Sequence, residues 1–180
     1  MTPDARSTPS TPNGGLPPPS GPYPVGRVTW HLPEATTSAS TGGAGVGREL
    51  IGWAWYPAAP GPGASVAPYL PPGWDALGQF WGFQPADARS HAYQEAPIAK
   101  DRAQFPVLLF SPAGFPPLVL AAILEEVASH GYVVIGVNHT GESPLTVFPD
   151  GRVVPLDAAR MQAVFGPYSG PPEELSLIHI

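Results

Sequence analysis

The sequence predicts an α/β fold that follows a Pro-rich leader, and three observations support this prediction. Two wholly apolar runs, Phe105–Phe110 and Tyr132–Val137, have the length and composition of strands buried on both faces. An amphipathic segment, Leu118–His130, lies between them. Strand, helix and strand within about 33 residues form a βαβ unit, whose strands should be parallel and joined by a right-handed crossover.

The composition is that of a folded, acidic chain. The 180 residues are 43% hydrophobic, which is too apolar for a disordered chain, and the formal net charge is −6. Only 8 residues are Lys or Arg, so no basic face is available for nucleic-acid phosphates, and a nucleic-acid partner is excluded. The absence of Cys excludes disulfides, zinc–thiolate sites and thiol nucleophiles.

Membrane and export signals are also missing from the sequence. No run reaches the ~18–20 consecutive apolar residues of a membrane span, which predicts no transmembrane segment. The first residues lack the apolar core of a signal peptide. This favours the cytoplasm without fixing the compartment.

The N-terminal third combines a leader with a predicted hairpin. Residues 1–21 are rich in Pro, Ser, Thr and Gly without periodicity, so we expect a disordered leader before a domain that spans residues 22–174. Arg27–Leu32 alternates and Glu49–Tyr56 carries β-favouring aromatics, so both are predicted strands. The Gly-rich segment Thr41–Gly47 would connect them as a hairpin loop.

Aromatic residues mark the next stretch, where Pro57–Gln104 otherwise reads as irregular. We expect the strand residues Trp53 and Trp55 to pack on a core. Trp74–Trp81 is a possible short helix, because Trp74, Leu77 and Trp81 share one face. This face could cover an apolar pocket or touch a lipid surface; the shortness of the segment and Gly78 favour the pocket.

The predicted crossover helix has defined ends and faces. Pro117 suits its first turn, and Gly131 suits the cap at its end. Its expected apolar stripe is Leu120, Ile123, Leu124 and Val127, and its expected outward residues are Glu125, Glu126 and Ser129. Beyond the second strand, Phe148–Val153 has the turn chemistry of a hairpin, Asp157–Phe165 is a possible short helix, and Gly166–Glu174 is a predicted loop.

The last six residues, 175–180, read Leu-Ser-Leu-Ile-His-Ile. They are the translation of CTG TCT CTT ATA CAC ATC, the end of a transposon adapter used to build sequencing libraries. We therefore expect adapter read-through, with a natural protein that continues past Glu174 and a chain that is its N-terminal fragment. The alternative is a genuine short apolar strand.

Two loops are candidates for chemistry because they follow the carboxyl ends of the predicted parallel strands. Ser111–Pro117 has small residues next to a helix start, where backbone N–H groups can hold a developing oxyanion; a plain tight turn is the alternative. Asn138–Pro144 contains His139 and Ser143, but Pro144 directly follows the serine, so the loop lacks the Gly-x-Ser-x-Gly pattern of a nucleophile elbow. We interpret His139 as a hydrogen-bonding loop anchor.

Other sites are not indicated. Gly63–Ala67 comes closer to the elbow in spelling but lies in a Pro-rich loop with no strand before it. The five His show no ligand spacing, so no metal site is predicted.

The order of segments resembles the platelet-activating-factor acetylhydrolase-like branch of the α/β-hydrolases. The matching pieces span about residues 21–155. They are Gly21–Gly26, Trp55–Ala58, Ala67–Pro71, Phe105–Pro112, Ala128–Val134, Asn138–His139 and Phe148–Val153.

This resemblance implies an incomplete α/β-hydrolase sheet that belongs to a serine esterase. The intact enzyme would cleave short or oxidised acyl chains from phospholipids with a Ser-Asp-His triad, without cofactor or metal, and would have transient contact with lipid surfaces. The resemblance implies an oxyanion-hole N–H at Gly114 or Phe115; the family usually has His-Gly or Pro-Gly where this chain has Pro112-Ala113-Gly114. No triad residue is recognised before Glu174, so the fragment should be inactive, with a parallel sheet that ends at an uncovered edge strand.

Two alternatives remain. The parent could be another hydrolase of the same fold, such as a polyester or dienelactone hydrolase. If Leu175–Ile180 is genuine, the chain could instead be a non-catalytic binding module that uses its aromatic region as a pocket.

Overall fold

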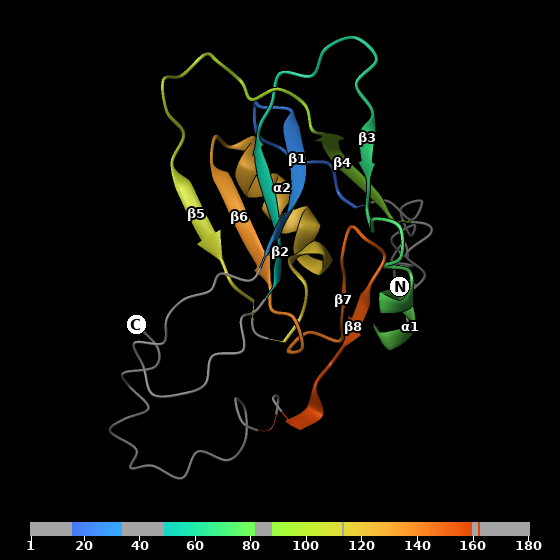
Figure 1. The fold of residues 1–180 in the computed structure, drawn as a ribbon. Coiled ribbons are helices and arrows are strands. Elements are labelled where there is room, and N and C mark those ends of the chain that lie inside the picture. Colours follow the sequence, from blue (N-terminus) through green and yellow to red (C-terminus); the bar gives the residue numbers. More distant parts are fainter. Residues whose placement is uncertain (1–15, 34–48, 82–87, 113, 160–161, 163–180) are drawn as a thin grey trace, which may run out of the picture.

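A mixed six-stranded sheet with the order β3-β4-β1-β2-β6-β5 forms the centre of the protein (Figure 1). The computed structural model describes residues 16–33, 49–81, 88–112, 114–159 and 162. The strands of this sheet are β1 (Val25–Leu32), β2 (Leu50–Pro57), β3 (Val66–Pro68), β4 (Arg89–Gln94), β5 (Val107–Phe110) and β6 (Val133–Asn138). The helices are α1 (Ala76–Trp81), the 3₁₀ helix η2 (Pro117–Leu120) and α2 (Ala121–Ser129), and β7 (Leu145–Val147) pairs with β8 (Val153–Pro155) in a separate small sheet.

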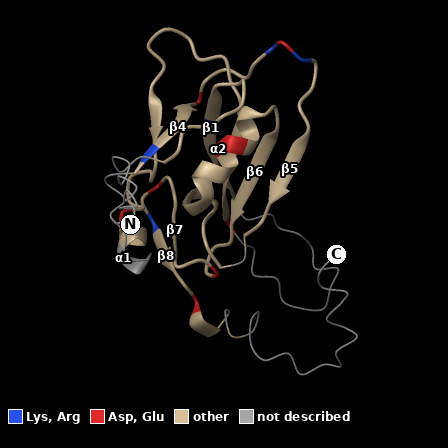
Figure 2. Ribbon diagram, turned by 180° about the vertical axis from the view of Figure 1, so that it is seen from behind, with Lys and Arg blue, Asp and Glu red and all other residues tan. Residues whose placement is uncertain are grey.

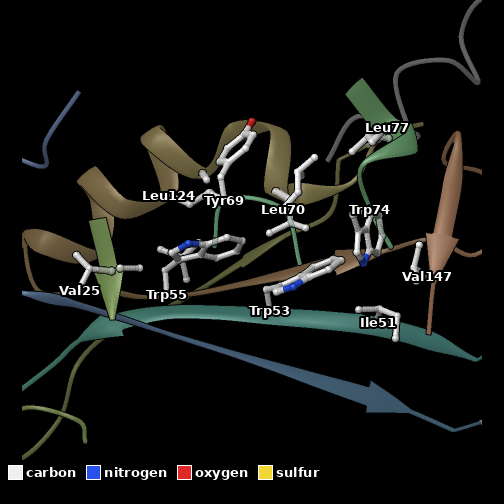
Figure 3. Packing of buried hydrophobic residues seen from close by; sticks show 14 of the residues in the cluster. Val25, Ile51, Trp53, Trp55, Tyr69, Leu70, Trp74, Leu77, Leu124 and Val147 are labelled. Carbon is white, nitrogen blue, oxygen red and sulfur yellow. The ribbon is translucent and has the colours of Figure 1, made fainter. Parts of the chain in front are cut away.

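The predicted N-terminal hairpin strands are confirmed. β1 and β2 pair antiparallel from Val25↔Pro57 to Leu32↔Leu50, while the Gly-rich connector lies outside the described residues. Because side chains alternate along a strand, Trp53 and Trp55 point to the same face of the sheet, where both are 0% exposed (Figure 3). Their prediction as core residues is therefore confirmed.

The βαβ unit is also confirmed, and it gives the chain its α/β class. β5 and β6 are parallel neighbours, and η2 and α2 form the connection between them. The helix packs on the face of the sheet that carries the two tryptophans (Figure 3). Ala121, Leu124 and Ala128 are the apolar residues that it buries there.

The predicted orientation of this helix is wrong in part. Glu125 and Ser129, expected to face outward, are 0% exposed, whereas Ile123, expected in the apolar stripe, is 58% exposed. Both polar residues have hydrogen-bond partners in their buried positions. Ser90 Oγ–H and the His91 N–H donate to the Glu125 carboxylate at 2.6 and 3.0 Å, and the Gly21 N–H donates to Ser129 Oγ at 3.0 Å. The helix thus presents small and polar residues to the sheet and places Ile123 on its outer side.

β5 departs from the prediction in its burial. It forms a strand as expected, but Val107, Leu108 and Leu109 are 56%, 42% and 80% exposed rather than buried on both faces. The reason is topological, since β5 is the last strand of the sheet and has a neighbour on one side only. The expected uncovered edge is therefore this strand.

The stretch predicted to be irregular contains two strands, β3 and β4, that the sequence did not predict. β4 pairs parallel with β1, and β3 pairs antiparallel with β4. The β4 sequence Arg-Ser-His-Ala-Tyr-Gln carries few of the residues typical of strands, so its pairing depends on tertiary partners. The short helix α1 is confirmed; Leu77 is buried, and Trp74 just before it is buried against Trp53.

Leu16–Gly21, the described part of the predicted leader, contacts the rest of the protein, while residues 1–15 lie outside the described part. The backbone N–H groups of Gly21 and Tyr23 donate to Ser129 Oγ and Ser129 O at 3.0 and 3.1 Å. A Cβ on Gly21 would lie 2.3 Å from the Ser129 backbone, so only glycine allows this approach. Hydrogen bonds from Ser20, together with His130, lower the pKa of Glu126 to about 2.

The C-terminal hairpin is confirmed by the pairing of β7 with β8 around Phe148–Arg152. Gly151 has φ +86°, which suits glycine at this turn. Of the possible helix Asp157–Phe165, the described residues 158, 159 and 162 are helical; the predicted loop and residues 175–180 lie outside the described part. None of the helices in the described ranges is long and apolar enough to cross a membrane.

Truncation of Trp53 should be among the most damaging core changes. Trp53→Ala removes a fully buried side chain from the centre of the cluster, so we expect urea unfolding to show a loss of about 3–5 kcal/mol. Ile123→Ala is the control, because this side chain is largely exposed and should change stability by no more than about 0.5 kcal/mol. Equal losses for the two variants would contradict the core described here.

The buried carboxylate of Glu125 should also be essential. Glu125→Ala leaves Ser90 Oγ–H and the His91 N–H without their acceptor and removes the negative charge that acts on the buried Arg27. We expect a loss of about 3 kcal/mol or more in urea unfolding. Glu126→Ala, at the half-buried neighbouring position, should cost clearly less; a fully stable Glu125→Ala would show that this network is dispensable.

Candidate active site

Two loops meet at one end of the sheet, where the parallel strands β5 and β6 both have their carboxyl ends (Figure 1). Ser111 is the first residue after β5 and His139 the first after β6. Ser111 Oγ and His139 Nε2 are 2.6 Å apart, which joins the two loops by a hydrogen bond. Ser111 is exposed and His139 half-buried, so the pair faces solvent at the edge where ligands bind in α/β sheets.

The two residues expected to supply an oxyanion N–H lie in the first of these loops. Gly114 has φ +73°, and Phe115 follows it; both are half-buried. Pro116 and Pro117 come next and have no N–H, so Gly114 and Phe115 carry the last backbone donors before the helical segment η2 begins. Their position at the end of β5 is the place where such donors can meet a substrate carbonyl.

Hydrogen bonds to the backbone oxygen of His139 hold the second loop together. This oxygen accepts from the N–H groups of Glu142 and Ser143 at 3.0 and 3.1 Å and from Ser143 Oγ–H at 3.2 Å. Ser143 is 1% exposed, so it is not available as a nucleophile, and His139 anchors its loop as interpreted. The sequence analysis missed that the His139 side chain also reaches Ser111; the available signal was that both residues directly follow adjacent parallel strands.

The Ser111–His139 pair has the spacing of a nucleophile and its base, yet the residue that follows Ser111 weakens this role. This residue is Pro112, so the N–H that would lie next to an attacked carbonyl is absent. The pair is therefore better suited to holding the loop that contains Gly114.

A cluster of charged side chains links the segments next to these loops. Arg152 Nη2 and His31 Nε2 contact the Glu49 carboxylate at 2.6 and 2.8 Å, and Arg152 Nε contacts Asp150 at 2.6 Å. Hydrogen bonds from Arg152, and then from His31, lower the pKa of Glu49. Thr140 Oγ1–H donates to the Glu49 backbone oxygen at 2.6 Å, so the cluster connects the hairpin of β7 and β8 to the loop after β6.

A pocket of about 600 Å³ lies beside this cluster. Its walls are mostly apolar and come from the end of β1, the loop before α1 and the β7–β8 hairpin. They are Thr29, Trp30, His31, Ile51, Pro71, Pro72, Gly73, Trp74, Val147, Phe148, Pro149, Gly151 and Val153. Ile51 pairs with Asn138 on β6, so two strand spacings, about 10 Å, separate this wall from the β5 end.

Trp74 lines this pocket, as the predicted role of its segment requires. It is 2% exposed and packs edge-on against Trp53, with ring centroids 5.4 Å apart (Figure 3). The side chain of Trp81 lies outside the described part. Among the described residues, no group of three or more His, Asp or Glu is arranged to hold a metal ion.

Comparison with solved structures gives an informative similarity. No family model and no curated protein matches the sequence. Among solved structures, a ferulic acid esterase from Streptomyces cinnamoneus matches with a TM-score of 0.66 and 28% sequence identity. The match covers 90% of this chain but 51% of the esterase, so the chain spans about half the length of that protein. The sheet is a partial α/β-hydrolase-like fold.

The Glu49 cluster should respond to acid. The folded-state pKa of Glu49 is below its ordinary 4.5, so the stabilisation that its ionised form gives is present above that value and is lost as pH falls through the lowered one. We expect Arg152→Met to lower the melting temperature at about pH 7 but to have little effect near pH 2. Lys100→Met, at an exposed site, is the control; a pH-independent effect of Arg152→Met would argue against the ion pairs as its cause.

Proposed function

We propose that this chain is the N-terminal part of a carboxylic ester hydrolase that uses a serine nucleophile. The observation that carries the proposal is the loop of Gly114 and Phe115 at the carboxyl end of β5, in a sheet that is superposable on that of an esterase. The neighbour's activity belongs to that protein, and half of its length has no counterpart here. We therefore propose esterase activity for the intact protein and not for this chain alone.

In the proposed mechanism this chain supplies one N–H of the oxyanion hole. A serine of the remaining half attacks the ester carbonyl carbon while a histidine takes its proton, and the carbonyl oxygen becomes an oxyanion. The N–H of Gly114 or Phe115 donates to this oxygen. Collapse of the intermediate expels the alcohol, which receives the proton from the histidine, and water then releases the acid from the acyl-enzyme by the same steps.

Three serines in the described part of the chain fit other roles, which supports a nucleophile after Glu174. Ser143 is buried and donates to backbone oxygens. Ser111 is followed by Pro112 and binds His139. Ser65 lies in the loop before β3 rather than on a strand-to-helix turn. The triad Ser, Asp and His are therefore assigned to the segment after Glu174.

We consider two substrate classes for the intact enzyme. The sequence resemblance favours phospholipids with short or oxidised acyl chains, with transient contact to a lipid surface. The structural neighbour is named for an aromatic acid, and the aromatic walls of the 600 Å³ pocket, including Trp74 and Phe148, favour an ester with an aromatic group. Polyester and dienelactone substrates would use the same oxyanion loop.

A substrate panel tests this proposal and separates the classes. The intact protein should hydrolyse p-nitrophenyl acetate, and its relative rates on methyl ferulate and a 2-acetyl phospholipid identify the preferred class. The chain ending at residue 180 is the matched control and should be inactive. An intact protein without activity on any ester would contradict the proposed function.

Substitution at Phe115 tests the donor itself. Phe115→Pro removes its N–H, whereas Phe115→Ala keeps it and removes only the ring. If Phe115 is the donor, kcat of the intact enzyme should fall about 10²–10³-fold in the proline variant and much less in the alanine variant. A proline variant with normal kcat that remains folded by circular dichroism would move the assignment to Gly114.

A further inference from the structure

Two side-chain hydrogen bonds hold the loop after β6 in place where the strand pairing has stopped. The pairing of β2 with β6 ends at Ile51↔Asn138, and its register places Glu49 opposite Thr140. At that position Thr140 Oγ1–H donates to the Glu49 backbone oxygen at 2.6 Å. A side chain thus replaces the backbone bond and connects the loop after β6 to the segment before β2.

The second bond joins this loop to the loop after β5. The parallel pairing of β5 with β6 ends at Phe110↔Gly136, and beyond it Ser111 Oγ and His139 Nε2 are 2.6 Å apart. His139 directly precedes Thr140, so the two bonds are attached to neighbouring residues. A displacement of Thr140 would therefore reach Ser111 through His139. We call Thr140, His139 and Ser111 the loop link.

The outer end of the loop link is anchored by charge. Arg152 Nη2 and His31 Nε2 contact the Glu49 carboxylate at 2.6 and 2.8 Å. These two residues come from the β7–β8 turn and from β1, so two further elements hold Glu49. Figure 2 shows no Lys, Arg, Asp or Glu on β5 or β6. The charged anchor therefore lies outside the two strands and acts on their loops through the hydrogen bonds of the loop link.

The candidate oxyanion donors depend on the loop link at one end of their loop. Ser111 starts this loop, and Gly114, with φ +73°, follows three residues later. At the other end Pro117 packs on Gly136 so closely that a Cβ on Gly136 would lie 2.7 Å from the Pro117 side chain. That packing does not involve the loop link. Loss of the link should therefore loosen the Ser111 end while the crossover helix stays in place.

From these contacts we propose that Thr140 is a positioning residue for the oxyanion donors. Its hydroxyl holds His139, and His139 holds Ser111 at the start of the loop that carries the donor N–H. The proposal rests on the proposed function, in which this N–H binds the oxygen of the attacked carbonyl. Preorganised donors stabilise the charge that develops on this oxygen, so a displaced loop should lower kcat more than it weakens substrate binding.

Nuclear magnetic resonance of this chain tests the loop link without a substrate. Thr140→Val removes the hydroxyl and keeps the shape of the side chain, whereas Thr140→Ser keeps the hydroxyl and is the matched control. In the valine variant the order parameter S² of the Gly114 and Phe115 amides should fall from about 0.85 to below about 0.6. The serine variant should keep the S² of the unaltered chain, and the amide of Ala54 in β2 should keep its S² in both variants.

Ser111→Ala breaks the link at its other end and should loosen the same two amides. The double variant with Thr140→Val should loosen them no further than either single variant, because both bonds act through His139. Three results would overturn the proposal: an unchanged S² at both amides in Thr140→Val, an equal fall at Ala54, or amides that are already mobile in the unaltered chain.

The intact enzyme tests the consequence for catalysis. Thr140→Val should lower kcat on p-nitrophenyl acetate about 10–100-fold with little change in KM, and Thr140→Ser should retain most of kcat. A normal kcat in the valine variant would overturn the positioning role. An intact protein that hydrolyses no ester, together with loosened amides in Thr140→Val, would support the loop link and contradict the proposed function, so the two failures are distinguishable.

Discussion

The close approach between the crossover helix and the sheet is the constraint on which the rest of the structure depends. A Cβ on Gly136 of β6 would lie 2.7 Å from Pro117 and 3.4 Å from the Trp55 ring, so glycine at this position allows η2 to rest on the sheet. Ala121 and Ala128, both 0% exposed, continue the contact along α2. Small residues at these points let the indoles of β2 fill the space between the layers (Figure 3).

This contact also determines where the loops lie. Because η2 begins directly after the Gly114 loop, packing of Pro116 and Pro117 on the core limits how that loop can move. On the other side, the Ser111–His139 hydrogen bond fixes the start of the loop to the end of β6. The candidate oxyanion donors are thus held from both ends before any substrate binds, which is the preorganisation that charge stabilisation requires.

The sequence predicted well those elements whose own residues carry the signal. The apolar strands, the antiparallel hairpin pair and the βαβ crossover follow from local periodicity and turn residues, and each was confirmed. β4 was missed because its polar sequence becomes a strand through pairing with β1 and through the bonds of Ser90 and His91 to Glu125. The burial of Glu125 could not be predicted for the same reason, since its partners come from a segment 34–35 residues away in sequence.

The candidate site was predictable in position but not in pairing. That two loops follow parallel strands fixes the edge at which they meet, yet the distance between Ser111 and His139 depends on loop conformations that the sequence does not encode locally. The exposure of β5 depends on what lies next to it in space. An apolar run of this kind is typical of a buried strand. Among the described residues, however, no strand pairs with the outer side of β5.

The most direct test of the central claim is to sequence the genomic locus across codon 174. The account predicts that the reading frame departs from Leu175–Ile180 and continues for roughly another hundred residues or more, with a Gly-x-Ser-x-Gly elbow followed by Asp and His. A gene that stops after Ile180 would contradict it. The protein would then have no nucleophile elbow, and its aromatic pocket would be the feature to test for binding.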